Sequence, residues 1–146
     1  MNTLEIETFV AGDGQCAAVF QGVFSADTLP PNPRLLICNT DPSYKPGRHW
    51  IAIYVDEERG IGEFFDSFGR RPSYEFERYM NEHCRYWTFN NRQLQSIISS
   101  FCGFYCCFYC MFRCRGFNMN NIANRFTKDT AFNDSIVHGF VCNKNN

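Results

Sequence analysis

The sequence has no surplus of charge of either sign. Fourteen Lys and Arg residues stand against fifteen Asp and Glu residues, which gives a formal net charge of −1. A protein that binds DNA or an anionic membrane through its overall charge needs a basic surplus, and this chain has none. The one mildly basic stretch is RCRGFNMNNIANRFTK (113–128), which we interpret as the solvent-facing side of helices. Nucleic acid as a partner therefore stays an open question.

Long hydrophobic runs are also missing. The most apolar stretch, FCGFYCCFYCMF (101–112), covers twelve residues, whereas a helix that spans a bilayer needs roughly 18 or more. The first residues, MNTLEIETFV, carry neither a basic cluster nor an apolar segment of signal-peptide length. We therefore expect no membrane partner and no secretion, and reduced thiols for most of the nine cysteines.

What the sequence does contain is a large apolar content on an ordinary domain length. Hydrophobic residues make up 45% of the 146 residues and aromatic residues 17%, which excludes a disordered chain. No repeat, low-complexity block or linker divides the sequence. We expect a single domain over residues 1–146 with a sizeable core.

Local patterns predict strands in the middle of the chain and helices on both sides of them. Buried runs and alternation predict strands at 34–40, 49–56, 61–69 and 84–89. Helical spacing and cap signals predict a helix after Ser73, a helix from Cys102 to about Arg115 with Gly116 as its stop, and two weaker helices around 119–126 and 129–141. This order is typical of an α+β fold.

The segment HWIAIYVD (49–56) alternates with a period of two. His49, Ile51, Ile53 and Val55 would share one face of the strand, and Trp50, Ala52 and Tyr54 would share the other. Trp50 keeps two interpretations: a wall of a site beside His49, or packing on the opposite strand face.

Cys102 has the surroundings that a cysteine nucleophile needs. A helix N-terminus lowers the pKa of a thiol, and Gly103 leaves room for a substrate backbone. His49 and Asp66 stand at the ends of two strands that a hairpin would bring to one sheet edge. Gln95 lies seven residues before Cys102, in the loop that leads to the helix. Each residue alone has an ordinary structural explanation, but together they supply a base, its orienting group and an oxyanion donor.

Two longer segments resemble the cysteine proteases of the adenain type, found in adenoviruses. HWIAIYVDEERGIGEFFDSFG (49–69) is similar to the family's His-Trp strand and its Phe-acid-x-Phe-Gly strand. LQSIISSFCGFYCCFYC (94–110) is similar to its Gln loop and its Cys-Gly helix. CAAVFQGVFSADTLP (16–30) and LLICNT (35–40) also match segments of that family, so the resemblance runs from about residue 14 to residue 115.

The resemblance implies an adenain/ubiquitin-like-protease α+β fold, with a central, mostly antiparallel sheet and the nucleophile at a helix N-terminus. It implies that Cys102 is the nucleophile, His49 the general base and acid, and Asp66 the group that orients His49. Gln95 and the backbone N–H of Cys102 would form the oxyanion hole. Adenain has a glutamate where this chain has Asp66, and an aspartate there resembles the proteases of ubiquitin-like modifiers.

The function implied is a cysteine endopeptidase that processes viral or mobile-element capsid precursors, as carried by Polinton/Maverick elements and related viruses. We expect a monomer that needs no cofactor for its chemistry and acts on polypeptides in the host nucleus, the cytoplasm or the virion. Two alternatives stay open: a protease that removes ubiquitin-like modifiers after Gly-Gly, and a catalytically dead scaffold.

Two regulatory features of adenain have weaker support in this sequence than the catalytic residues have. Adenain is activated by a peptide that forms a disulfide with a cysteine, and Cys84 falls at the matching place, eighteen residues before Cys102. An ordinary buried thiol explains Cys84 equally well. Stimulation by DNA, the other feature, is disfavoured by the near-neutral charge.

The remaining cysteines have a simpler interpretation. Cys102, Cys106, Cys110 and Cys114 recur every four residues and would form a stripe along one helix. Four tetrahedral zinc ligands rarely come from one helix, and no second ligand pair lies at zinc-finger spacing. We expect no metal, a core stripe of small apolar thiols, and an exposed, reactive thiol only at Cys102.

Overall fold

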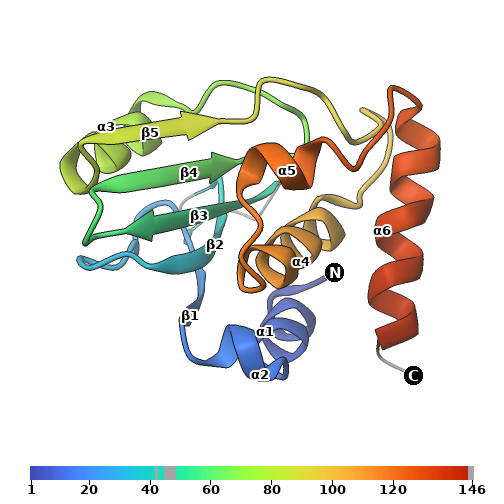
Figure 1. Ribbon diagram of the computed structural model, residues 1–146, viewed down its shortest axis with the longest axis horizontal. Coiled ribbons are helices and arrows are strands. Elements are labelled where there is room, and N and C mark those ends of the chain that lie inside the picture. Colours follow the sequence, from blue (N-terminus) through green and yellow to red (C-terminus); the bar gives the residue numbers. More distant parts are fainter. Residues whose placement is uncertain (42, 45–48, 145–146) are drawn as a thin grey trace.

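The computed structural model describes residues 1–41, 43–44 and 49–144. Its centre is one five-stranded sheet with the strands side by side in chain order (Figure 1). These strands are β1 (Phe20–Phe24), β2 (Leu35–Asn39), β3 (Trp50–Asp56), β4 (Ile61–Phe65) and β5 (Tyr86–Phe89). Helices cover both faces of this sheet, as expected for the α+β class.

The sheet is mixed, which corrects the expectation that it is mostly antiparallel. β3 pairs antiparallel with β2 and with β4, whereas each edge strand, β1 and β5, runs parallel to its neighbour. A parallel pair needs a connection that crosses back over the sheet. The proline-rich segment 25–34 returns the chain from β1, and helix α3 (Tyr74–His83) returns it from β4.

The helices are distributed unequally over the two faces. On one face lie α1 (Thr3–Ala11), α2 (Gly14–Ala17), α4 (Cys102–Arg113), α5 (Met119–Ala123) and α6 (Thr130–Lys144), whose apolar side chains form the larger core. Helix α3 alone covers the other face and forms a second, smaller core with it. Helix α4 is sandwiched between β3 and α6, so it lies at the centre of the larger core (Figure 1).

The alternation predicted for β3 is confirmed. Ile51, Ile53 and Val55 are buried against α3 in the smaller core. Trp50, Ala52 and Tyr54, by contrast, face the helices of the larger core. His49 precedes the strand, so the alternation does not fix the direction of its side chain.

The predicted elements are all present, with shifted ends. Ser73 is the N-cap residue of α3 without a side-chain cap bond, and α4 ends at Arg113, two residues before the predicted end. The strand expected over 61–69 stops at Phe65, because the chain turns there toward Gly69. Strand β1 and helices α1 and α2 were not predicted individually.

The cysteine stripe of α4 is a core feature. Cys106 and Cys110 are fully buried, and Cys107 beside them is fully buried as well. Among the described residues all nine cysteines are free thiols. No helix in the described part of the chain combines the length and the apolar character that crossing a membrane requires.

Gly62 in β4 lets α3 approach the sheet closely. A methyl group at this position would lie 2.5 Å from Cys84 Sγ and 3.0 Å from Met80 Cε. Cys84 follows the last residue of α3 and belongs to the smaller core, with 9% of its surface exposed. The absent side chain of Gly62 is therefore the space into which the Cys84 thiol packs.

This contact predicts that Gly62→Ala lowers the free energy of unfolding by about 1–3 kcal/mol, because the added methyl overpacks a dense core. Removal of the Cys84 sulfur should relieve the clash. The double variant Gly62→Ala/Cys84→Ala should therefore lose less than the sum of the two single losses, measured by denaturant unfolding under reducing conditions.

The matched control is Gly14→Ala at the start of α2, where an added methyl meets nothing within 4 Å. It should change the free energy of unfolding by less than about 0.5 kcal/mol. Strict additivity of Gly62→Ala and Cys84→Ala would contradict the packing described here.

Candidate active site

The hairpin of β3 and β4 brings His49 and Asp66 together. His49 directly precedes β3 and Asp66 directly follows β4, so the antiparallel pairing places both at one edge of the sheet. His49 Nε2 and Asp66 Oδ1 lie 2.6 Å apart, and both side chains are largely shielded from solvent. The predicted pair of base and orienting group is therefore assembled in the folded chain.

Asp66 makes several hydrogen bonds besides the one to His49, through its carboxylate and through its backbone. The backbone N–H of Phe68 donates to Asp66 Oδ1 at 2.9 Å. The backbone N–H of Asp66 donates to Asn90 Oδ1 at 2.8 Å, and Asn90 Nδ2 donates to the Asp66 carbonyl at 2.6 Å. The Phe68 bond thus holds the carboxylate and the two Asn90 bonds hold the Asp66 backbone before any substrate binds, as the predicted orienting role requires.

The His49 ring is also held by stacking. The Phe68 ring lies 4.7 Å from it, with an interplanar angle of 29°. The guanidinium of Arg70 lies 4.8 Å from the centroid of the Phe68 ring. Asp66 at one ring nitrogen and Phe68 at the ring face together define the orientation of the imidazole.

Cys102 is the first residue of α4, as predicted, but its thiol is not exposed. Only 8% of the residue is accessible, which corrects the expectation of an exposed thiol. Phe101 occupies the N-cap position and offers no side-chain acceptor, so it caps none of the free N–H groups of the first turn. The positive end of the helix dipole therefore faces the sulfur.

The environment favours a charged thiolate and imidazolium pair. Burial by itself raises the pKa of Cys102, but the hydrogen bond and charge of His49 and the backbone N–H groups of Trp50 and Gly103 lower it below its usual value. Burial by itself lowers the pKa of His49, yet hydrogen bonds to Asp66 and Cys102 raise it to about 9. Because Nε2 is bonded to Asp66, Nδ1 is the nitrogen left for the thiol.

Gln95 is fully buried in the segment that leads to α4. Its Oε1 accepts a hydrogen bond of 2.5 Å from the Ser67 hydroxyl. Its Nε2 lies 3.1 Å from both the carbonyl and the hydroxyl oxygen of Ser99. The amide nitrogen is thus directed into the short segment that ends at Cys102.

Several of these supporting residues were not found from the sequence. Asn90 and Ser99 gave no local signal, because their partners lie in other segments of the fold. Ser67 and Phe68 stand inside the quoted FDSFG stretch, so the motif contained them without revealing their roles. A polar residue that is fully buried beside a catalytic candidate is a signal only the folded chain provides.

Trp50 satisfies both of its interpretations in part. Its side chain packs with the larger core. A methyl group at Gly103 would lie 3.4 Å from Trp50 Cδ1, so the indole borders Gly103, the residue directly after Cys102. Its backbone N–H also contributes to the lowered pKa of Cys102.

Cys84 lies away from these groups, under α3. Its thiol packs against Gly62, and burial raises its pKa. Both observations describe an ordinary core thiol and favour that interpretation over a disulfide-forming one.

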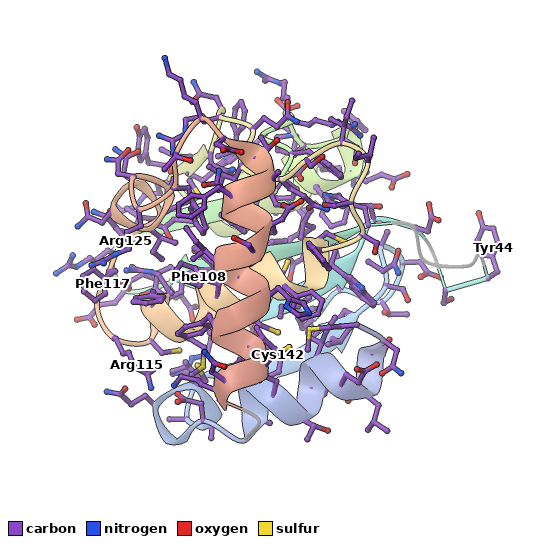
Figure 2. All side chains as sticks on the ribbon, turned by 90° about the vertical axis from the view of Figure 1, so that its right-hand side faces the viewer. Tyr44, Phe108, Arg115, Phe117, Arg125 and Cys142 are labelled. Carbon is purple, nitrogen blue, oxygen red and sulfur yellow. The ribbon has the colours of Figure 1, made fainter. Side chains whose placement is uncertain are left out.

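The three arginines of the mildly basic stretch contact other side chains. Arg113 lies over the Tyr54 ring at 4.0 Å, and Arg115 pairs with Asp13 at 2.7 Å. Arg125 lies over Phe117 at 4.8 Å, and Figure 2 shows the two close together beside α6. Two of the three arginines are therefore paired with carboxylates, Arg115 with Asp13 and Arg113 with Glu63 at 3.4 Å.

Within residues 1–41, 43–44 and 49–144 no group of three or more His, Cys, Asp and Glu side chains is arranged to hold a metal ion. Of the cysteine stripe, Cys106 and Cys110 belong to the larger core and Cys114 packs against it.

No protein-family model and no curated protein matches this chain. Two structures of ASFV pS273R protease are similar to it. One has a TM-score of 0.58 at 20% identity over 88% of this chain, and a selenomethionine form has 0.52 at 25% identity over 76%. The SUMO protease Ulp1, with its catalytic cysteine oxidized to a sulfonic acid, gives 0.48 at 11% identity over 99% of this chain and 78% of its own.

The chain spans 63% and 45% of the two ASFV pS273R protease chains it matches. The chain has the fold of the ASFV pS273R protease, and the resemblance to adenain-type cysteine proteases that the sequence indicated is confirmed.

Proposed function

We propose that this chain is a cysteine endopeptidase in which Cys102 is the nucleophile, His49 the general base and acid, and Asp66 the orienter of His49. The observation that carries the proposal is the buried hydrogen-bonded pair of His49 and Asp66 beside a thiol of lowered pKa at a helix N-terminus. A dead scaffold would not need to keep these charged groups buried and paired, because burial of ionised side chains costs stability.

The groups present account for each step of peptide hydrolysis. The Cys102 thiolate attacks the scissile carbonyl, and the new oxyanion accepts hydrogen bonds from the Cys102 backbone N–H and from Gln95 Nε2. The His49 imidazolium then donates its proton to the leaving amine, and an acyl-thioester remains on Cys102. His49, now neutral, removes a proton from water, which attacks the thioester and releases the carboxylic acid and the Cys102 thiolate, so that the thiolate and imidazolium pair is restored.

The substrate class proposed is a viral or mobile-element structural precursor. Support comes from the similar ASFV pS273R protease. Gly103, expected to leave room for a substrate backbone, is buried instead against this chain's own Ile6, Met1 and Trp50, which an added methyl would meet at 3.3 to 3.4 Å. An activating peptide would have to reach Cys84 under α3, where only 9% of the residue is exposed. We therefore propose cleavage without a covalently bound activator or DNA.

The proposed function makes a prediction about the nucleophile. Purified protein should cleave fluorogenic peptides that carry an apolar residue two positions before Gly-Gly, and Cys102→Ala should abolish the cleavage while the far-ultraviolet circular dichroism stays unchanged. Cys142→Ala, on the outer helix α6, is the matched control and should retain full activity.

A preference for a ubiquitin-like modifier over these peptides would move the substrate class to deconjugation. Absence of turnover on both substrates, with or without added peptide and DNA, would contradict the proposed activity.

The proposed function also makes a prediction about the pH range in which Cys102 and His49 are both charged. Because the pKa of Cys102 is lowered and that of His49 is raised to about 9, the ion pair should persist through neutral pH and be lost as His49 deprotonates near pH 9. Iodoacetamide should alkylate Cys102 rapidly at pH 6, where an ordinary thiol is protonated. Peptide mapping by mass spectrometry identifies the modified residue.

Asp66→Asn removes the carboxylate that raises the pKa of His49. The alkaline limb of kcat/KM should then move to lower pH, and the rate of Cys102 alkylation at pH 8 should fall. An alkaline limb that stays at the same pH in Asp66→Asn would show that Asp66 does not set the ionisation of His49.

A further inference from the structure

We propose that Ser67 is a positioning residue of the oxyanion hole, whose hydroxyl fixes the orientation of the Gln95 carboxamide. The inference rests on the proposed function, because it assigns a role within the same reaction. It extends that function to a residue that touches neither the nucleophile nor the base.

The contact between the two residues is deeply buried. Ser67 and Gln95 are both fully inaccessible to solvent, and the Ser67 hydroxyl lies 2.5 Å from Gln95 Oε1. The Ser67 carbonyl also accepts the backbone N–H of Leu94 at 2.9 Å and that of Gln95 at 3.0 Å. Ser67 therefore fixes both the backbone and the side chain of Gln95.

The hydrogen bonds determine which way the carboxamide faces. The Ser99 carbonyl can only accept, so the Gln95 atom 3.1 Å from it must be the amide nitrogen. The opposite end is then Oε1, which accepts from Ser67. A reversed amide would place Oε1 against the Ser99 carbonyl, so the Ser99 carbonyl selects the observed orientation and the Ser67 hydroxyl stabilises it by donating to Oε1.

This orientation matters because an oxyanion repels an amide oxygen. In the resting chain, Gln95 Nε2 donates to neutral Ser99 oxygens in the segment that leads into Cys102. When negative charge develops on the substrate, an N–H can move from a neutral acceptor to a charged one, which binds it more strongly. Without the Ser67 hydroxyl, the buried Oε1 loses its donor and the carboxamide is held at its nitrogen end alone, so it leaves this orientation more easily.

Ser67 directly follows Asp66, so neighbouring residues contact the proposed base and the proposed oxyanion donor. Asp66 bonds His49 through its side chain, and the next residue bonds Gln95. A single turn after β4 therefore orients the base and the oxyanion donor together. The relative placement of these two groups depends on one peptide unit rather than on two independent loops.

A double-mutant cycle tests the proposal. Gln95→Ala should lower kcat by about 10²–10³-fold, the usual loss for an oxyanion donor. Ser67→Ala should lower kcat about 10-fold with KM nearly unchanged, and it should cost nothing further in the Gln95→Ala background. An equal loss in both backgrounds would mean a purely structural role and would overturn the proposal, as would full activity in either single variant.

The matched control is Ser73→Ala on the far side of the sheet, where an exposed serine makes no side-chain cap bond. This variant should retain the wild-type kcat and KM. The alkaline limb of the pH profile should stay in place in Ser67→Ala, since His49 and Asp66 are untouched.

A second measurement does not depend on turnover. The side-chain amide signals of Gln95, identified by their loss in Gln95→Glu, should exchange with solvent at least about 10-fold faster in Ser67→Ala than in the wild type. Equal exchange would refute the positioning role even in an inactive protein. Failure of the proposed protease function, by contrast, is judged separately from wild-type turnover compared with Cys102→Ala.

Discussion

The antiparallel register of β3 and β4 is the constraint on which the site depends. Ala52 pairs with Phe65 in this hairpin, so the residues that precede β3 and follow β4 must meet at one edge. A slip of one residue would turn every side chain of β3 to the opposite face and exchange its apolar residues between the two cores, where their sizes no longer fit. The packing of Ile53 against α3 and of Ala52 against α4 therefore also fixes the distance between His49 and Asp66.

Burial of the charged pair is costly, and the surrounding groups show how the cost is offset. Desolvation opposes charge on both Cys102 and His49. The carboxylate of Asp66 compensates at the imidazole, while backbone N–H groups and the helix terminus compensate at the sulfur. Because these dipoles are fixed by the sheet and by α4, they need no reorganisation when the charge moves onto the substrate.

Local patterns in the sequence were sufficient for β2 to β5 and α3 to α6, and for the order of the candidate residues His49, Asp66, Gln95 and Cys102. Alternation in β3 placed Trp50 and Ile51 on the correct faces, and the Cys-Gly pair marked the start of α4. The parallel edge strands, the burial of Cys102 and the bond between Ser67 and Gln95 were not predictable in this way. Each of these depends on segments that are distant in sequence, so no local period encodes it.

The position of each cysteine along α4 determines the environment of its thiol, and therefore the direction in which its pKa is shifted. Burial raises the pKa of Cys106 and Cys110 along the stripe, and nothing cationic offsets it there. Cys114 at the opposite end also has a lowered pKa, but the cause is a hydrogen bond from Cys16, and a thiolate at a helix C-terminus faces the negative end of the dipole. Among the cysteines of the described residues, Cys102 is the one at which an imidazolium, backbone donors and the positive end of the helix act together, and this combination supports its proposed role as the nucleophile.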